Sequence, residues 1–156
     1  MGRPKTPART PRDTLGKSYA GTPSTRRRMQ KQRTRDTAPE MAIRRLLHAA
    51  GLRYRVDFSP LPGSRRRADL VFTSSRVAVF VDGCFWHGCP IHGSQSRTNS
   101  QFWSQKIESN VLRDNNTDAA LRDADWLPLR VWEHEDPALA AKRVQAIVTA
   151  RRKPRY

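Results

Sequence analysis

The fold is decided near the middle of the chain, where the run Val77-Ala78-Val79-Phe80-Val81 leads directly into Asp82-Gly83-Cys84-Phe85-Trp86-His87-Gly88-Cys89. The apolar run predicts a central buried strand over Arg76–Val81. The loop after it offers thiols, an imidazole and large aromatic rings. A second short apolar run, Ala68–Phe72, carries the carboxylate of Asp69. We therefore expect a small sheet with chemically active groups at the strand ends.

The flanking segments complete an α/β pattern. Thr37 and Glu40 form a capping box that opens a helix ending at Gly51, with Ile43, Leu46 and Leu47 facing inward. Further strands are expected over 52–58 and 126–132. Further helices are expected over 100–123, where a kink at 114–117 is left open, and after Asp136-Pro137; their inward residues would be Phe102, Ile107, Val111, Leu121, Leu139, Val144, Ile147 and Val148. The order predicts an α/β sandwich around a small mixed sheet.

Length and charge limit the possible function classes. A chain of 156 residues forms one domain, and a net charge of +16 favours a polyanionic partner, above all nucleic acid. We expect a disordered basic tail over 1–24, a DNA-gripping basic arm over 25–36 within a domain spanning 25–150, and a basic tail over 151–156. The arm carries Arg26, Arg27, Arg28 and Met29. Without an apolar span or signal region, the protein is expected to be cytoplasmic.

Strand-end oxygens predict a site for a hard cation. Phosphodiester hydrolysis uses a divalent cation to polarise the phosphoryl oxygen and to activate water. Magnesium prefers few protein oxygens, and a hairpin would bring the Asp69 carboxylate near the backbone carbonyl of Val81 and near Asp82. An aspartate at a strand end is also commonly a turn residue or a salt-bridge partner. The basic context favours the catalytic interpretation.

The loop after the central strand predicts a structural zinc site. Cys84, Cys89 and His92 follow the spacing C-x4-C-x2-H, and His134 after the last strand is the best fourth ligand. A Cys84–Cys89 disulfide or two reduced thiols are the alternatives. His87 is then free for proton transfer near neutral pH, although a loop histidine is often a bystander.

Three aromatic side chains are candidates for contact with DNA bases. Phe85 and Trp86 lie on the loop, and Trp103 begins the following helix. Rings of this kind unstack base steps, at the lowest cost where pairing is already poor. The alternative is that they cover the core of the sheet.

Taken together, these residues resemble the very-short-patch-repair (Vsr) DNA mismatch endonucleases over about residues 24–134. The resemblance rests on Thr34-Arg35-Asp36-Thr37-Ala38, Glu40, Leu61-Pro62-Gly63, Asp69, Gly83-Cys84-Phe85-Trp86-His87, Phe102-Trp103 and Trp132-Glu133. It implies a three-layer restriction-endonuclease-like fold. It also implies a monomeric, Mg²⁺-dependent enzyme that nicks double-stranded DNA on the 5′ side of the thymine in a T·G mismatch, the product of 5-methylcytosine deamination.

The same resemblance implies roles for individual residues. Asp69 and the carbonyl of Val81 would bind Mg²⁺, His87 would be the catalytic imidazole, and Glu40 would orient the site. The remaining roles are a wedge (Phe85, Trp86, Trp103), a minor-groove arm containing Met29, and structural Zn²⁺ ligands (Cys84, Cys89, His92, His134).

The chain departs from the family pattern at three places. Asp82 stands where some members have a second histidine, so Asp82 could contact the metal. The zinc ligands His92 and His134 stand where a member has cysteines, and the run Arg65-Arg66-Arg67 is additional. Two rival functions follow: an endonuclease for other damage or sequences, and a non-catalytic zinc-stabilised DNA-binding protein.

Overall fold

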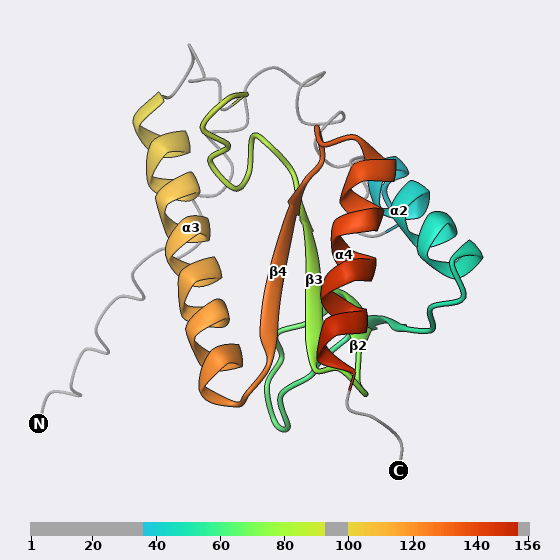
Figure 1. Ribbon diagram of the computed structural model, residues 1–156. Coiled ribbons are helices and arrows are strands. Elements are labelled where there is room, and N and C mark those ends of the chain that lie inside the picture. Colours follow the sequence, from blue (N-terminus) through green and yellow to red (C-terminus); the bar gives the residue numbers. More distant parts are fainter. Residues whose placement is uncertain (1–35, 93–99, 153–156) are drawn as a thin grey trace, which may run out of the picture.

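The computed structural model describes residues 36–92 and 100–152 and shows one four-stranded sheet between helices (Figure 1). The predicted order of helix, three strands, helix, strand and helix is confirmed. The elements are α2 (Ala38–Ala49), β1 (Arg55–Phe58), β2 (Ala68–Phe72), β3 (Val77–Asp82), α3 (Ser100–Asp123), β4 (Leu127–Trp132) and α4 (Pro137–Arg151).

The sheet is mixed, with β3 in its interior. β1, β2 and β3 are antiparallel neighbours, and β4 is parallel to β3. Val79 lies opposite Leu70 on one side and Leu129 on the other. The first strand is shorter than predicted: Gly51 ends α2 in a left-handed conformation (φ +83°), and Leu52 packs into the core before β1 begins at Arg55.

Helices cover both faces of the sheet, which gives three layers. On one face α2 and α4 pack together over a core that includes Ile43, Leu47, Leu70, Phe72, Val79, Val144 and Val148. On the other face, Leu121 of α3 packs against Ala68, Val71 and Ala78. Figure 1 shows α3 on the opposite side of the sheet from α2 and α4.

Three predicted inward residues are instead exposed: Leu46 (41%), Val111 (36%) and Leu139 (66%). In α4 the buried stripe is Ala140, Ala141, Val144 and Val148. Of the residues predicted to face inward from α4, Val144 and Val148 are buried, Ile147 is partly buried against the core, and Leu139 is exposed. The predicted inward face of α4 is therefore confirmed apart from Leu139, and Ala140 and Ala141 are buried in addition.

The helix ends show which predicted caps form. Asp136 accepts hydrogen bonds from the N–H groups of Ala138 (2.8 Å) and Leu139 (3.2 Å), as expected at the start of α4. The Thr37 side chain makes no cap bond, contrary to the predicted capping box, but the Glu40 carboxylate does accept from backbone groups of Asp36 and Thr37. No helix in the part of the chain that the structure describes is both long and apolar enough to cross a bilayer.

Helix α3 continues without a break through residues 114–117, where a kink was left open. Aspartates inside a helix usually compete for backbone hydrogen bonds. Here Asp114 and Asp118 make contacts with side chains outside the helix instead, and the Thr117 hydroxyl donates to the Arg113 carbonyl. The polar run therefore makes side-chain contacts from α3 and does not break the helix.

Candidate active site

The predicted cation ligands, Asp69 on β2 and Val81 on β3, lie side by side on neighbouring antiparallel strands. The Asp69 Oδ2 atom accepts a hydrogen bond of 2.7 Å from the Val81 N–H. The hairpin thus places this carboxylate at the backbone of Val81, as expected. The two residues are therefore in direct contact. That they bind a metal stays a prediction.

Acidic neighbours surround Asp69. Burial, as the largest cause, and the nearby charges of Glu40, Asp82 and Asp57 together raise the pKa of Asp69 to about 6, against the lowering effect of the hydrogen bond from the Val81 N–H. Glu40 is only 2% exposed and its pKa is also raised by burial. Carboxylates that repel one another at neutral pH favour a cation between them. Their donor chemistry therefore fits Mg²⁺.

Asp82 has a different role from the one expected. Its side chain ends β3 and is bound by Arg130 of β4, whose Nη1 lies 3.1 and 3.0 Å from the two carboxylate oxygens. Burial raises the pKa of Asp82 while the Arg130 charge lowers it. The carboxylate of Asp82 is thus occupied by an internal cation. The salt-bridge alternative describes Asp82 better than contact with a metal does.

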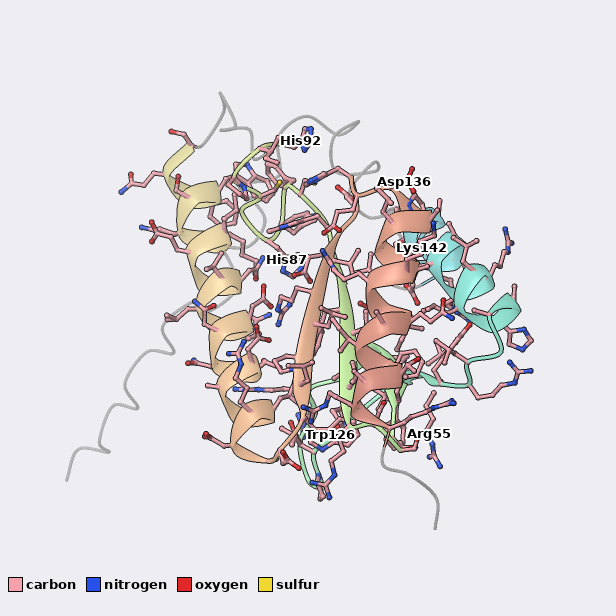
Figure 2. All side chains as sticks on the ribbon, in the orientation of Figure 1. Arg55, His87, His92, Trp126, Asp136 and Lys142 are labelled. Atoms are coloured by element: carbon pink, nitrogen blue, oxygen red, sulfur yellow. The ribbon has the colours of Figure 1, made fainter. Side chains whose placement is uncertain are left out.

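His87 is bound to α3 through Asp114. Its Nδ1 lies 2.6 Å from Asp114 Oδ2 and 3.8 Å from Asp82 Oδ1. An ionised carboxylate only accepts hydrogen bonds, so Nδ1 carries the proton and a neutral imidazole keeps the lone pair on Nε2. Figure 2 shows His87 between α3 and β4. This arrangement leaves Nε2 able to accept a proton.

Three residues of this network were not predicted: Arg130, Asp114 and Asp118. Arg130 lies in the middle of an otherwise mostly apolar strand, and Asp114 and Asp118 are one helical turn apart on α3. A like-charged pair at that spacing is unfavourable without a cation nearby. The sequence did contain a signal for this network: an arginine inside an apolar strand and two aspartates one turn apart on a helix. Together they would have predicted an ion pair between the strand and the helix.

The four predicted zinc ligands come together at the same end of the sheet. The ligand atoms of Cys84, Cys89, His92 and His134 all lie within 4.8 Å of one another. Cys84 Sγ is 3.1 Å and Cys89 Sγ 3.6 Å from His134 Nδ1. Tetrahedral zinc with bonds of about 2.3 Å to sulfur and about 2.1 Å to nitrogen separates such atoms by about 3.5 Å. Both cysteines are free thiols, so the disulfide alternative is wrong. The four residues fit zinc by type and spacing, and the choice between zinc and two reduced thiols stays a prediction.

The three candidate wedge residues form one aromatic cluster, with Phe102 added to it. Phe85, Trp86 and Trp103 make edge contacts with one another at centroid distances of 5.2–5.6 Å. All are partly exposed, and Asn110 of α3 donates to the Trp86 carbonyl at 2.9 Å. The cluster therefore spans the loop and the start of α3 without entering the sheet core. The other predicted DNA contacts, Met29 and Arg26–Arg28, lie outside the described residues.

Comparisons of the sequence with known proteins identify its relatives. The sequence model of the family described as DNA mismatch endonuclease Vsr matches residues 19–92. The chain is 49% identical to type II nicking enzyme V.NaeI of Lentzea aerocolonigenes over 112 residues, which cover 70% of this chain and 68% of that protein. It is 44% identical to V.XorIIP of Xanthomonas oryzae pv. oryzae over 115 residues, 72% and 82% of the two chains. It is 40% identical to DNA mismatch endonuclease Vsr of Escherichia coli K12 over 102 residues, 64% and 63% of the two chains.

Proposed function

Since the chain belongs to the DNA mismatch endonuclease Vsr family, and is therefore a DNA endonuclease, we propose that it nicks duplex DNA on the 5′ side of the thymine in T·G mismatches. The observation that supports this proposal best is the placement of Asp69 against Val81 and among acidic neighbours, one of which, Asp82, also lies 3.8 Å from His87 Nδ1. In this proposal, the reaction is hydrolysis of one phosphodiester bond.

The chain's own residues divide the chemistry between them. Asp69 and the Val81 backbone carbonyl would hold Mg²⁺, which when bound polarises the scissile phosphate and lowers the pKa of water. Glu40 keeps a further negative charge beside Asp69. The Nε2 atom of His87 transfers the proton, and Asp114 holds the ring in the tautomer that this transfer needs.

Recognition of the mismatch is assigned to the aromatic cluster of Phe85, Trp86 and Trp103. Insertion of a ring between base steps costs a few kcal/mol of stacking, and this cost is lowest at a mispair. The edge contacts within the cluster orient the rings before DNA binds. The excess of positive charge supplies affinity for the phosphates without sequence preference.

Structural zinc on Cys84, Cys89, His92 and His134 would stabilise the loop that carries His87 and the rings. Three of the ligands lie on or next to that loop, and His134 follows β4. Binding of one zinc ion by all four residues would therefore connect the loop to the end of β4. This connection would fix His87 and the aromatic rings relative to the sheet.

A strand-specific nicking assay tests the proposal. End-labelled duplexes that differ in one base pair (T·G, U·G, T·A and C·G) are incubated with the protein, with and without Mg²⁺. We expect a Mg²⁺-dependent nick 5′ to the thymine of T·G alone or well above the paired duplexes, and we expect none with Asp69→Ala. Nicking of paired duplexes at the same rate would reject mismatch specificity, and undiminished activity of Asp69→Ala would reject the cation site.

A second candidate is the same chemistry at T·G mismatches, but within a sequence context that differs from the one recognised by the Escherichia coli protein. Two observations favour it: the identity is higher to V.NaeI (49%) than to the Escherichia coli protein (40%), and the basic run Arg65-Arg66-Arg67 precedes Asp69. A library of T·G duplexes with randomised flanking bases separates the two candidates. Enrichment of one flanking sequence among the nicked products identifies the context.

A further inference from the structure

The guanidinium group of Arg130 lies within ion-pair distance of the carboxylates of three aspartates, Asp82, Asp114 and Asp118. Its Nη1 binds Asp82 at 3.0 Å, and its Nε and Nη2 bind Asp118 at 3.1 and 2.8 Å. Asp114 Oδ1 is 3.5 Å from Nη1. The guanidinium carbon also lies 4.3 Å from the centre of the Phe80 ring, which supports the planar group from one side.

These contacts are shielded from solvent, so they differ from ordinary surface ion pairs. The side chains of Asp82, Asp118, Asp114 and Arg130 are between 6% and 21% exposed. Without a cation, three carboxylates would repel one another in a poorly solvated space. A planar fork with several donors meets all three at once, which a single ammonium group does not do.

Both carboxylates near the His87 ring are held by this one cation. Asp114 uses Oδ2 for His87 Nδ1 at 2.6 Å and turns Oδ1 toward Arg130, while Asp82 Oδ1 lies 3.8 Å from Nδ1 on the strand side. Asp82 belongs to β3 and Asp114 to α3, so Arg130 on β4 connects the two elements on which the imidazole rests.

Asp82, His87 and Asp114 also have the spacing of a metal site, since their ligand atoms lie within 4.8 Å of one another. The Arg130 guanidinium already supplies positive charge to two of the three. A bound cation at this position would face that charge directly. The geometry therefore favours a cluster organised by arginine, with the metal confined to the Asp69 side.

We propose that Arg130 is a positioning residue for hydrolysis: its guanidinium fixes Asp114 and Asp82, and these hold the His87 ring with Nε2 directed at the substrate. The inference rests on the proposed function, in which His87 transfers the proton. Loss of the fork would let Asp114 move or turn on α3. Displacement of a reacting group by about 1 Å lowers rates by about 100-fold.

Single-turnover nicking of a T·G duplex by excess, magnesium-loaded full-length protein tests the proposal. We expect Arg130→Gln to nick about 10- to 100-fold more slowly, while the Kd for the same duplex, measured without Mg²⁺, changes less than about threefold. Arg130→Lys restores the charge but not the fork, so it is expected to recover only a small part of the rate. The matched control Arg76→Gln removes the same charge at the far end of β3, where Arg76 pairs with the exposed Asp125, and should nick normally.

A double-mutant cycle with Asp114→Asn separates positioning from a general structural role. If Arg130 acts through Asp114, the loss caused by Arg130→Gln shrinks to less than about threefold in the Asp114→Asn background. The ¹⁵N spectrum of the imidazoles should also show His87 leaving its single Nδ1–H tautomer in Arg130→Gln. Losses that multiply fully, or a wild-type rate for Arg130→Gln, would overturn the proposal. If Arg130→Gln does not fold, Arg130→Lys and Asp118→Asn carry the same comparison.

His87→Ala distinguishes failure of this inference from failure of the proposed function. If His87→Ala nicks at the wild-type rate, the assignment of proton transfer to His87 is wrong and the positioning role falls with it. If His87→Ala is slow while Arg130→Gln and Arg130→Lys are normal, only the positioning role is wrong.

Discussion

Asp69→Asn should abolish nicking and yet make the metal-free protein more stable at neutral and alkaline pH. The side chain keeps its shape, and the amide oxygen can still accept from the Val81 N–H, which lies 2.7 Å from the carboxylate. What disappears is a negative charge that is buried beside Glu40 and Asp82. Such charge is unfavourable until a cation neutralises it.

The size of the effect follows from the pKa. The pKa of Asp69 rises from 3.8 to about 6 on folding, and each pKa unit corresponds to about 1.4 kcal/mol. The upper figure is therefore about 3 kcal/mol, or about 6–12 °C in Tm for a chain of this size. Asp69 keeps some contact with solvent, and water screens its charge. We therefore expect a difference in Tm in the lower half of the range of about 6–12 °C.

The pH dependence has a definite sign. Between pH 3.8 and about 6 the unfolded chain loses its Asp69 proton while the folded chain keeps it, so the wild type loses stability as pH rises. The penalty is absent below pH 3.8 and complete above pH 6–7. The advantage of Asp69→Asn should therefore be near zero at pH 4 and constant at pH 7.5 and above.

Thermal unfolding of both proteins from pH 4 to 8.5, without added Mg²⁺ and with zinc retained, measures this difference. Asp125→Asn is the matched control, since it removes the same charge from a side chain that is 76% exposed. Added Mg²⁺ should raise the Tm of the wild type at pH 8 but not that of Asp69→Asn. A Tm of Asp69→Asn at or below the wild type at pH 8, or a difference that does not vary with pH, would refute the reasoning.

Three further predictions concern the loop after β3. Trp86→Ala should lower the T·G-to-T·A nicking ratio about 10-fold with little change in affinity for paired duplex, because stacking on a base is worth about 1–3 kcal/mol; an unchanged ratio would show that the ring only packs. Cys84→Ser should reduce the zinc content, measured by atomic emission, from one ion per chain toward none and should lower the Tm, whereas full zinc content would remove Cys84 from the ligand set. Gly88→Ala should cost about 2 kcal/mol in urea unfolding, because φ is +65° and the new Cβ would lie 3.2 Å from Ile107 Cγ2. Gly63→Ala, with φ +74° and open space, should cost about 1 kcal/mol, and equal costs would exclude the contact.

Local sequence patterns predicted the helices and strands, and they predicted that Cys84, Cys89, His92 and His134 come together; the zinc itself stays a prediction. Two of these patterns depend only on residues that are close together in the chain. The apolar run Val77–Val81 predicted the central strand, and the spacing of Cys84, Cys89 and His92 predicted the ligand cluster. His134 was found because strands that pair side by side end at the same edge when they are parallel, as β3 and β4 do.

The carboxylates around Arg130 were beyond this reasoning because charge compensation depends on tertiary contacts. Asp82 was expected near the metal, and only the position of Arg130 on the neighbouring strand shows that an internal cation already binds it. On α4 only Leu139 was misplaced: Ala140 and Ala141 are buried beside it while Leu139 is exposed, and hydrophobic period alone does not distinguish these options.

The distribution of the site along the chain has a consequence for biosynthesis. Asp69, Val81 and His87 leave the ribosome before Asp114, Arg130 and His134, and the Cys84–His134 contact spans 50 positions. Contacts between such distant positions form only after the intervening chain exists and its closure entropy is offset. A nascent chain therefore carries Asp69, Val81 and His87 before Asp114, Arg130 and His134 exist, so the contacts between these two parts of the chain cannot all form until residue 134 has been translated.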